Sequence, residues 1–217
     1  MKKVLSSMKW LSVIIAACCF ITVCLTGCSS PSSKAAPFQI AFCSLYINDN
    51  AVSEYAASLQ NSMPELRIDG NAPLCTPMIM GEVQNDIEAG VINDPMMAMG
   101  GMIKLAALVA TGEIDVVIAD LDNAARDARG DMYLPLVEVF TEQELSALSD
   151  RLLSFDLVET DGYETIPTGE RTPICGINIT GNEAMTPIFG NQEIGVFIVA
   201  NTKNLGLAKS VMLSLVH

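Results

Sequence analysis

Sulfur atoms are the most distinctive chemical groups in this sequence. Two short segments carry them, Cys75-Thr-Pro-Met78-Ile-Met80 and a run that holds Met96, Met97, Met99 and Met102. Thiolate and thioether ligands select Cu(I), so a copper site is one hypothesis. The second run lies in a helical pattern beside Ile103 and Leu105, where methionine commonly fills irregular gaps in a core. Because no internal histidine supports a metal, we expect packing methionines, with no metal site and no cofactor.

Acid–base catalysis is a second possibility. Carboxylates at two-residue spacing occur at Asp120 and Asp122 and again at Glu142 and Glu144, but in a chain with 25 acidic residues such pairs are usually solvated. The chain has no G-x-S-x-G, no H-E-x-x-H and no glycine-rich phosphate loop, and its one histidine is His217. A calcium site at Asp120, Asp122 and Asn123 would lack the remaining ligands of an EF-hand loop. We predict a protein that is not an enzyme.

Polar side chains that follow two predicted strands are the best candidates for binding a ligand. In open parallel α/β sheets, ligands bind outside the carboxyl ends of the strands. These candidates are Ser44, Tyr46, Asn48 and Asp49 after the first strand and Asp120, Asp122 and Asn123 after the third. They could orient a small molecule by hydrogen bonds, and Tyr46 could stack on a ring. Asp49 and Asp120 also stand where helix N-caps are needed, so capping is the competing interpretation.

The elements that would position these residues alternate between strand and helix. Strands are predicted at 38–46, weakly at 66–68, and at 114–119; helices are predicted from Asp49 or Asn50 to about Asn61 and at 94–111. The second helix has Asp94 as N-cap, Pro95 at its first position and Gly112 at its end. The pair Gly100-Gly101 inside it indicates close helix packing or a kink. This alternation predicts an α/β fold with a mostly parallel sheet flanked by helices.

The C-terminal part is predicted to be small and mixed. Thr141-Glu-Gln-Glu144 has the spacing of a capping box, and a helix would follow through Leu145, Leu148 and Leu152. A hairpin is predicted around the turn Asp161-Gly162. Further strands are expected at 174–179 and 193–200, before a closing helix at 204–216 with Leu205, Ala208, Val211, Met212 and Leu215 facing inward.

The N-terminus resembles a bacterial lipoprotein signal. Met1-Lys-Lys precedes an apolar run from Trp10 to Leu25, which is short for a membrane span, and Leu25-Thr-Gly-Cys28 resembles a lipobox. The resemblance implies that residues 1–27 are removed and that Cys28 carries lipid, leaving a tether at 28–37 and one domain at 38–217. It implies a protein anchored on the extracytoplasmic face of the cell membrane. An uncleaved signal anchor or a non-lipidated signal is the alternative.

Removing that segment changes the charge and the cysteine count. The whole chain has a formal charge of −13, and loss of Lys2, Lys3 and Lys9 makes it −16. Such a balance argues against nucleic acid as a partner, because nucleic acid is bound through contacts of Lys and Arg with phosphate. Cys43, Cys75 and Cys175 remain, so at most one internal disulfide forms. Free buried cysteines are the default expectation.

The order of segments from residue 112 onward resembles extracellular solute-binding lipoproteins of the periplasmic binding protein type 2 class. The segments are Gly112-Glu-Ile-Asp-Val-Val-Ile-Ala-Asp120, Tyr133-Leu-Pro-Leu-Val-Glu138, Pro173-Ile-Cys-Gly-Ile-Asn-Ile-Thr180 and Ile194-Gly-Val-Phe-Ile-Val-Ala-Asn201. The resemblance implies a protein that binds a small solute and partners an ABC permease. Members usually have two full lobes, whereas 180 residues supply one lobe and a remnant. A degenerate member that acts as a protein-interaction module is therefore the alternative.

Overall fold

The computed structural model describes residues 36–80, 95–161 and 164–216. The predicted signal segment and Cys28 lie outside these residues. The helices are α2 (Asp49–Ser62), α3 (Pro95–Thr111), α4 (Leu121–Arg129), α5 (Glu142–Ala147), α6 (Thr186–Phe189) and α7 (Leu205–Ser214), with short 3-10 turns at Pro64–Leu66 and Leu136–Glu138. The strands are β1 (Gln39–Ser44), β2 (Leu74–Ile79), β3 (Val116–Asp120), β4 (Leu152–Leu153), β5 (Asp156–Asp161), β6 (Glu164–Arg171), β7 (Gly176–Asn178) and β8 (Ile194–Ile198).

Six strands form one mixed sheet in the order β2-β1-β3-β8-β7-β4. β1 pairs in parallel with β2 and β3, whereas β8 runs antiparallel to both β3 and β7, and β4 runs antiparallel to β7. The α/β class is confirmed, but the prediction of a mostly parallel sheet is wrong. The connection from β7 to β8 contains the four-residue helix α6, and β8 pairs directly with β7 in the antiparallel direction. Antiparallel neighbours need no helix that crosses from one end of the sheet to the other. The chain therefore returns to the sheet at the same end of the strands at which it left β7.

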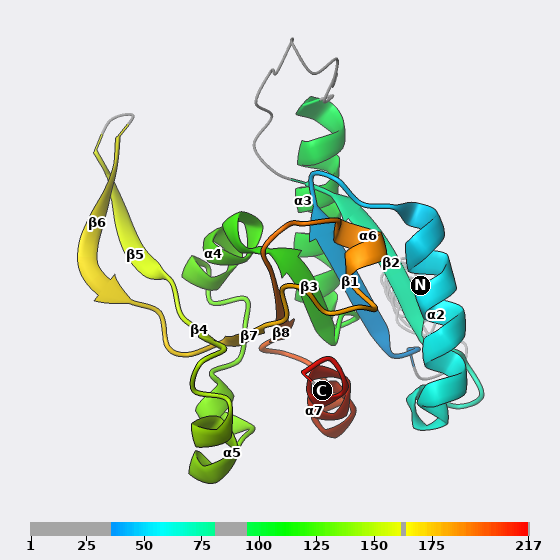
Figure 1. Cartoon of the computed structure of the whole chain (residues 1–217). Helices are drawn as coiled ribbons and strands as arrows, with labels where there is room; N and C mark the ends of the chain where they lie inside the picture. Colours follow the sequence, from blue (N-terminus) through cyan, green and yellow to red (C-terminus); the bar gives the residue numbers. More distant parts are fainter. Residues whose placement is uncertain (1–35, 81–94, 162–163, 217) are drawn as a thin grey trace, which may run out of the picture. The chain divides into compact units, whose positions relative to one another are not determined.

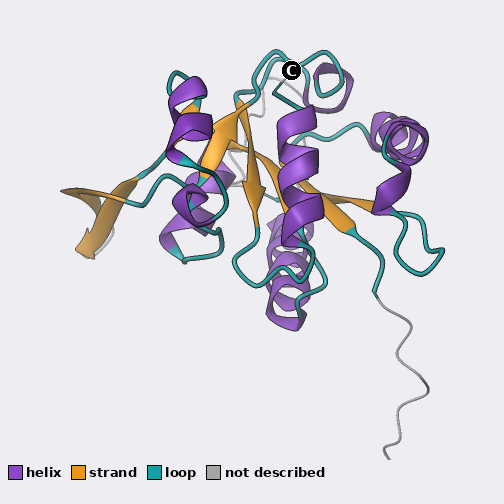
Figure 2. Ribbon diagram, turned by 90° about the horizontal axis from the view of Figure 1, so that it is seen from below, coloured by secondary structure: helices purple, strands orange, loops and turns teal. Residues whose placement is uncertain are grey.

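Helices lie on both faces of this sheet (Figures 1 and 2), and the core forms two layers, one on each face. Alternate residues of β1 separate the layers: Ile40 and Phe42 belong to one cluster, and Ala41 and Cys43 to the other. The first cluster is covered by α2 and α7, and the second by α3 and α4. This alternation follows from the two-residue period of a strand buried on both faces.

The second strand lies later than the sequence predicts. Residues 66–68 do not form it: Pro64 begins a 3-10 turn that ends at Leu66, and Ile68 makes only an isolated bridge to Asn71. β2 contains Pro77, which has no N–H to donate to a neighbouring strand. Proline is tolerated on edge strands, and β2 is at the edge of the described sheet. Because of Pro77, the sequence pattern did not indicate a strand at Leu74–Ile79 and placed it at 66–68 instead.

Several helix ends also differ from prediction. The N-cap of α2 is Asn48, whose side chain accepts a hydrogen bond from the Ala51 N–H, and not Asp49 or Asn50. The predicted cap of α3, Asp94, lies outside the described residues. The capping box of α5 is confirmed, but this helix ends at Ala147, and Leu152 belongs to β4. In α7, Leu205 is 39% exposed although it was predicted to face inward.

The predicted hairpin is confirmed as β5 and β6, which form a separate two-stranded sheet that extends away from the main one (Figure 1). Asp161 pairs with Glu164, so the connection consists of residues 162 and 163 and not of Asp161-Gly162. Those two residues lie outside the described part of the chain. Both faces of β6 are exposed from Thr165 to Arg171.

Gly101 sets how closely α3 approaches the sheet. A Cβ built on Gly101 would lie 2.1 Å from the carbonyl oxygen of Ile79, whereas nothing lies within 4 Å of the same atom on Gly100. Of the two packing interpretations of the glycine pair, close approach is the correct one for Gly101.

We predict that Gly101→Ala lowers the free energy of unfolding by about 1–3 kcal/mol, because α3 must move away from β2. Gly100→Ala is the matched control, and it should raise stability by up to about 1 kcal/mol through helix propensity. Urea denaturation of the two variants measures this difference. Equal effects would contradict the close packing of α3 on β2.

Candidate functional site

Gln192, which lies just before β8, is hydrogen-bonded to the tip of β1 and to the end of α6. The hydroxyl of buried Ser44 donates to Gln192 Oε1 at 2.5 Å, and Gln192 Nε2 donates to the carbonyl oxygens of Tyr46 and Phe189 at 3.0 and 2.7 Å. Ser44 therefore lies at the strand tips as predicted, but its hydroxyl is used inside the protein. Sequence reasoning missed Gln192, and its one signal was its position just before a predicted strand.

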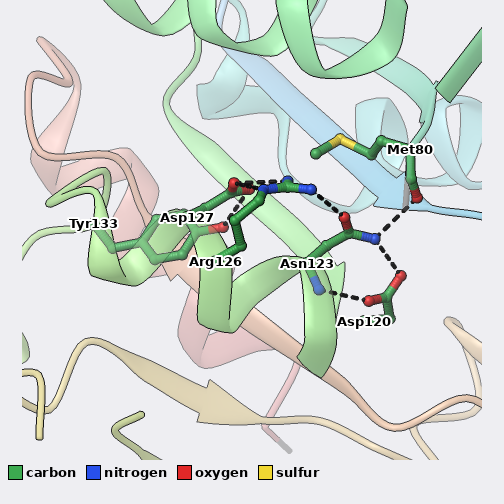
Figure 3. Close-up of polar contacts among 6 residues, drawn as sticks. All are labelled: Met80, Asp120, Asn123, Arg126, Asp127 and Tyr133. Atoms are coloured by element: carbon green, nitrogen blue, oxygen red, sulfur yellow. Dashed lines mark hydrogen bonds and ion pairs between the residues drawn. The ribbon is translucent and has the colours of Figure 1, made fainter. Parts of the chain in front are cut away.

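Asp120 and Asn123 form the first turn of α4 (Figure 3). Asp120 Oδ1 accepts from the Asn123 N–H at 2.9 Å, which makes it the N-cap. Asn123 is buried, and its Nδ2 donates to Asp120 Oδ2 at 2.8 Å and to the carbonyl oxygen of Met80 at 2.9 Å. Capping is thus the observed role of Asp120. Asn123 closes the gap between the end of β2 and the start of α4.

The polar contacts of Asp120 and Asn123 continue along α4 through an ion pair, and we call this row of side chains the polar stripe. Arg126 donates to Asn123 Oδ1 at 2.8 Å, and its Nη2 lies 2.7 Å from Asp127 Oδ1. The Tyr133 hydroxyl is 3.5 Å from Asp127 Oδ2. Asp127 is 7% exposed, and this burial raises the pKa of its carboxyl group, although Arg126 opposes the rise. Figure 3 shows the stripe running from Asp120 to Tyr133.

The three cysteines of the described residues are free thiols with raised pKa values. Burial raises the pKa of Cys75 to about 12 and that of Cys175 to about 11, and it raises the pKa of Cys43 well above its ordinary value. Burial likewise raises the pKa of Tyr133, which packs on Phe197 with ring centroids 4.4 Å apart. A thiol is nucleophilic only as a thiolate, so these cysteines are not activated for chemistry.

A hollow at the strand tips, here called the tip hollow, is the candidate binding site. It has a volume of about 210 Å³ and is lined by Asp120, Leu121, Asp122, Gln192 and Glu193. Asp122 and Glu193 are exposed, so their carboxylates face solvent at the mouth. Asp122 and Glu193 offer carboxylate oxygens to a donor-rich or positively charged molecule.

The remaining predicted site residues lie outside the tip hollow. Asn48 caps α2, and Asp49 is exposed in the first turn of that helix. Tyr46 is 51% exposed. The structure therefore brings Asp120 and Asp122 together with Gln192 and Glu193 and links Ser44 to them through Gln192, but it does not bring in Asn48 or Asp49.

A larger hollow of about 540 Å³ lies near the C-terminal ends of β7 and α7. Two of its polar side chains are already paired: Arg151 donates to the Val216 carbonyl oxygen and Asn182 to that of Leu215, both at 2.9 Å. Asp120 and Gln192 of the tip hollow are paired as well, so pairing does not separate the two hollows. We take the smaller tip hollow as the better candidate because it lies at the carboxyl ends of the parallel strands β1 and β3, the end at which parallel strands bind ligands.

The sulfur-bearing residues do not converge. Met78 and Met80 are buried in the cluster beneath α3, whereas Cys75 packs against the cluster on the opposite face of the sheet. Met99 is 61% exposed on the outside of α3. Within the described ranges, no three His, Cys, Asp or Glu side chains are grouped so as to hold a metal ion.

Comparisons with protein-family models, with curated protein sequences and with solved structures found no match for this chain. In the part of the chain that the structure describes, no helix combines the length and apolar character needed to cross a bilayer.

The ion pair of α4 gives a prediction with a defined pH dependence. Arg126→Met should lower stability at pH 7 by about 3 kcal/mol, since it leaves the Asp127 carboxylate buried without its cation. The raised pKa in the folded state means that the folded protein holds this proton more tightly, so the loss should shrink as the pH falls toward 4. Denaturation at several pH values measures it.

The double variant Arg126→Met with Asp127→Asn is the control. Without the buried charge it should recover most of the lost stability and should show little of the added pH dependence. A loss in Arg126→Met that is the same at pH 4 and pH 7 would contradict the role assigned to Asp127.

Proposed function

We propose that this protein is a lipid-anchored extracytoplasmic protein that binds a small, positively charged solute in the tip hollow. The observation that carries the proposal is that Asp122 and Glu193 line one hollow with Asp120, at the carboxyl ends of the parallel strands β1 and β3, the end at which parallel strands bind ligands. The two exposed carboxylates would attract an amine or guanidinium group. The resemblance to type 2 solute-binding lipoproteins and the lipobox-like segment at Cys28 support the same role.

The openness of the tip hollow bears on affinity. The described residues supply one sheet with its helices and a projecting hairpin, and no second lobe among them closes over the strand tips. A ligand held from one side buries less of its surface than one enclosed in a cleft. We therefore expect weak binding, with delivery to a permease or another membrane protein as the accompanying role.

A thermal-shift screen of the protein tests solute binding. Putrescine, arginine and choline are suitable cationic probes, with succinate as an anionic comparison. At 100 times its Kd a ligand adds about 2.7 kcal/mol to the stability of the folded state, so a bound cation should raise the Tm by several degrees.

Asp122→Asn should weaken the response to the same cation roughly tenfold, because one of the attracting charges is lost. Glu54→Gln, which removes an exposed charge on α2, is the matched control and should leave the response unchanged. The proposal is contradicted if no cation stabilises the protein, or if both variants respond alike.

The anchor is tested separately. Cys28→Ser should abolish incorporation of labelled palmitate and release the protein from the membrane fraction, because lipid supplies the attachment. Cys24→Ser changes a cysteine of the predicted signal and should keep both label and location. Retained label in Cys28→Ser would place the modification elsewhere.

A second candidate function is a protein-interaction module at the cell surface. The specific observation in its favour is the outer side of α3, where Met99 and Ile103 are 61% and 64% exposed. Large apolar side chains gathered on one exposed face are typical of an interaction surface.

A further inference from the structure

The outward face of α3 is apolar from Met99 to Ala110. Leu105, Leu108 and Val109 pack toward the sheet. The opposite side of the helix carries Met99, Ile103, Ala106 and Ala110, at spacings of four, three and four residues, and all four are exposed. Such spacing defines one continuous stripe along an α-helix. We call these four residues, with the adjacent exposed Ala107, the α3 face.

Charge on the α3 face differs from charge on the rest of the protein. The chain carries 25 acidic residues and a net charge of −13, yet residues 95–111 include no acidic residue and one basic residue, Lys104. Two copies of so acidic a chain repel each other over most of their surface. Two copies that meet through the exposed side of α3 bring no carboxylates of that helix together, because α3 has none.

Side-chain size along the α3 face fits a twofold axis. Large side chains, Met99 and Ile103, occupy its first half, and small ones, Ala106, Ala107 and Ala110, occupy its second half. In an antiparallel pair of α3 helices related by an axis at Ile103, Met99 of one copy lies opposite Ala107 of the other. Met99 of each copy then fills the space left by Ala107 of the other, and the two Ile103 side chains meet on the axis, as an isologous interface allows.

The neighbouring edge of the sheet is a poorer site for self-association. β2 is an edge strand of the described sheet, but Pro77 in its middle cannot donate a hydrogen bond to a strand of another copy. Pairing through the α3 face needs no backbone hydrogen bonds. It therefore avoids the obstacle that Pro77 presents.

From these observations we infer that the α3 face binds a second copy of this chain, in an antiparallel helix pair centred on Ile103. A 17-residue helix is about 25 Å long and about 10 Å wide, so its face is smaller than the area of about 800 Å² per partner in standard complexes. We expect a weak dimer, which tethering to a membrane would favour by raising the local concentration. This inference does not depend on solute binding in the tip hollow.

Cysteine cross-linking of the full-length chain tests the inference. Ile103→Cys should give a strong homodimer with a short bifunctional maleimide, because position 103 lies on the axis. A mixture of Met99→Cys and Ala107→Cys chains should cross-link several-fold more than either chain alone, because these positions lie opposite each other. Ser53→Cys, at an exposed position of α2, is the matched control, and the unsubstituted chain gives the background.

Each contrary result overturns the inference. Cross-linking of Ile103→Cys no greater than that of Ser53→Cys would exclude the interface. Preferential cross-linking of Met99→Cys with itself would indicate a parallel pair. Cross-linking only to a different protein would show that the α3 face binds another partner.

Disruption by charge provides an independent readout. Ile103→Glu places a carboxylate on the axis, facing its own counterpart, and should reduce the dimer fraction in sedimentation by roughly tenfold or more. Ser53→Glu adds the same charge on α2 and should leave that fraction unchanged. Because Ile103 is 64% exposed, its variant should keep the melting temperature of the parent chain, and an unchanged dimer fraction would overturn the inference.

Discussion

The hydrogen bonds of Asn123 are the constraint on which the strand-tip region depends. β2 and β3 are not neighbours, because β1 lies between them. Asn123 nevertheless links the two, because its side chain donates both to the carbonyl oxygen of Met80, directly after β2, and to Asp120, the last residue of β3 and the N-cap of α4. A buried carboxamide is costly unless its groups are paired, so this pairing fixes where α4 begins. The polar side chains of α4 continue through partly exposed Arg126 to buried Asp127, while Asp122 of the same helix is exposed. One helix thus supplies both the structural polar stripe and a wall of the tip hollow.

The antiparallel direction of β8 determines which residues complete the tip hollow. Asp120 pairs with Ile194, so the start of β8 lies beside the end of β3, and Gln192 and Glu193 come to the strand tips with it. A parallel β8 would have brought the other end of that strand, near residue 199, to the same place. The direction of this single strand therefore decides the chemistry of the site. It also ties the tip of β1 to the rest through the hydrogen bonds of Gln192.

The sequence predicts features that depend on residues close together in the chain better than features that depend on contacts between distant segments. Local signals were sufficient for the capping box at Thr141 and Glu144, for the buried strand before Asp120 and for the hairpin of β5 and β6. Strand direction in the C-terminal half depends on the lengths of connections and on pairing between distant segments, which periodicity does not report. The sequence therefore placed Asp120 and Asp122 at a strand tip but could not find Gln192 and Glu193, and it missed β2 because of Pro77.

The central claim is that the tip hollow, built by α4 and the start of β8, is where this protein binds a small cation. Backbone amide NMR during titration with putrescine tests that claim most directly, since each residue reports its own surroundings. Binding in the tip hollow should give saturable shifts concentrated at residues 120–123 and 192–194, with the amides of α2 and α7 unmoved. Shifts concentrated in the larger hollow near Asn178 and Asn182, or none at any cation concentration, would contradict the claim.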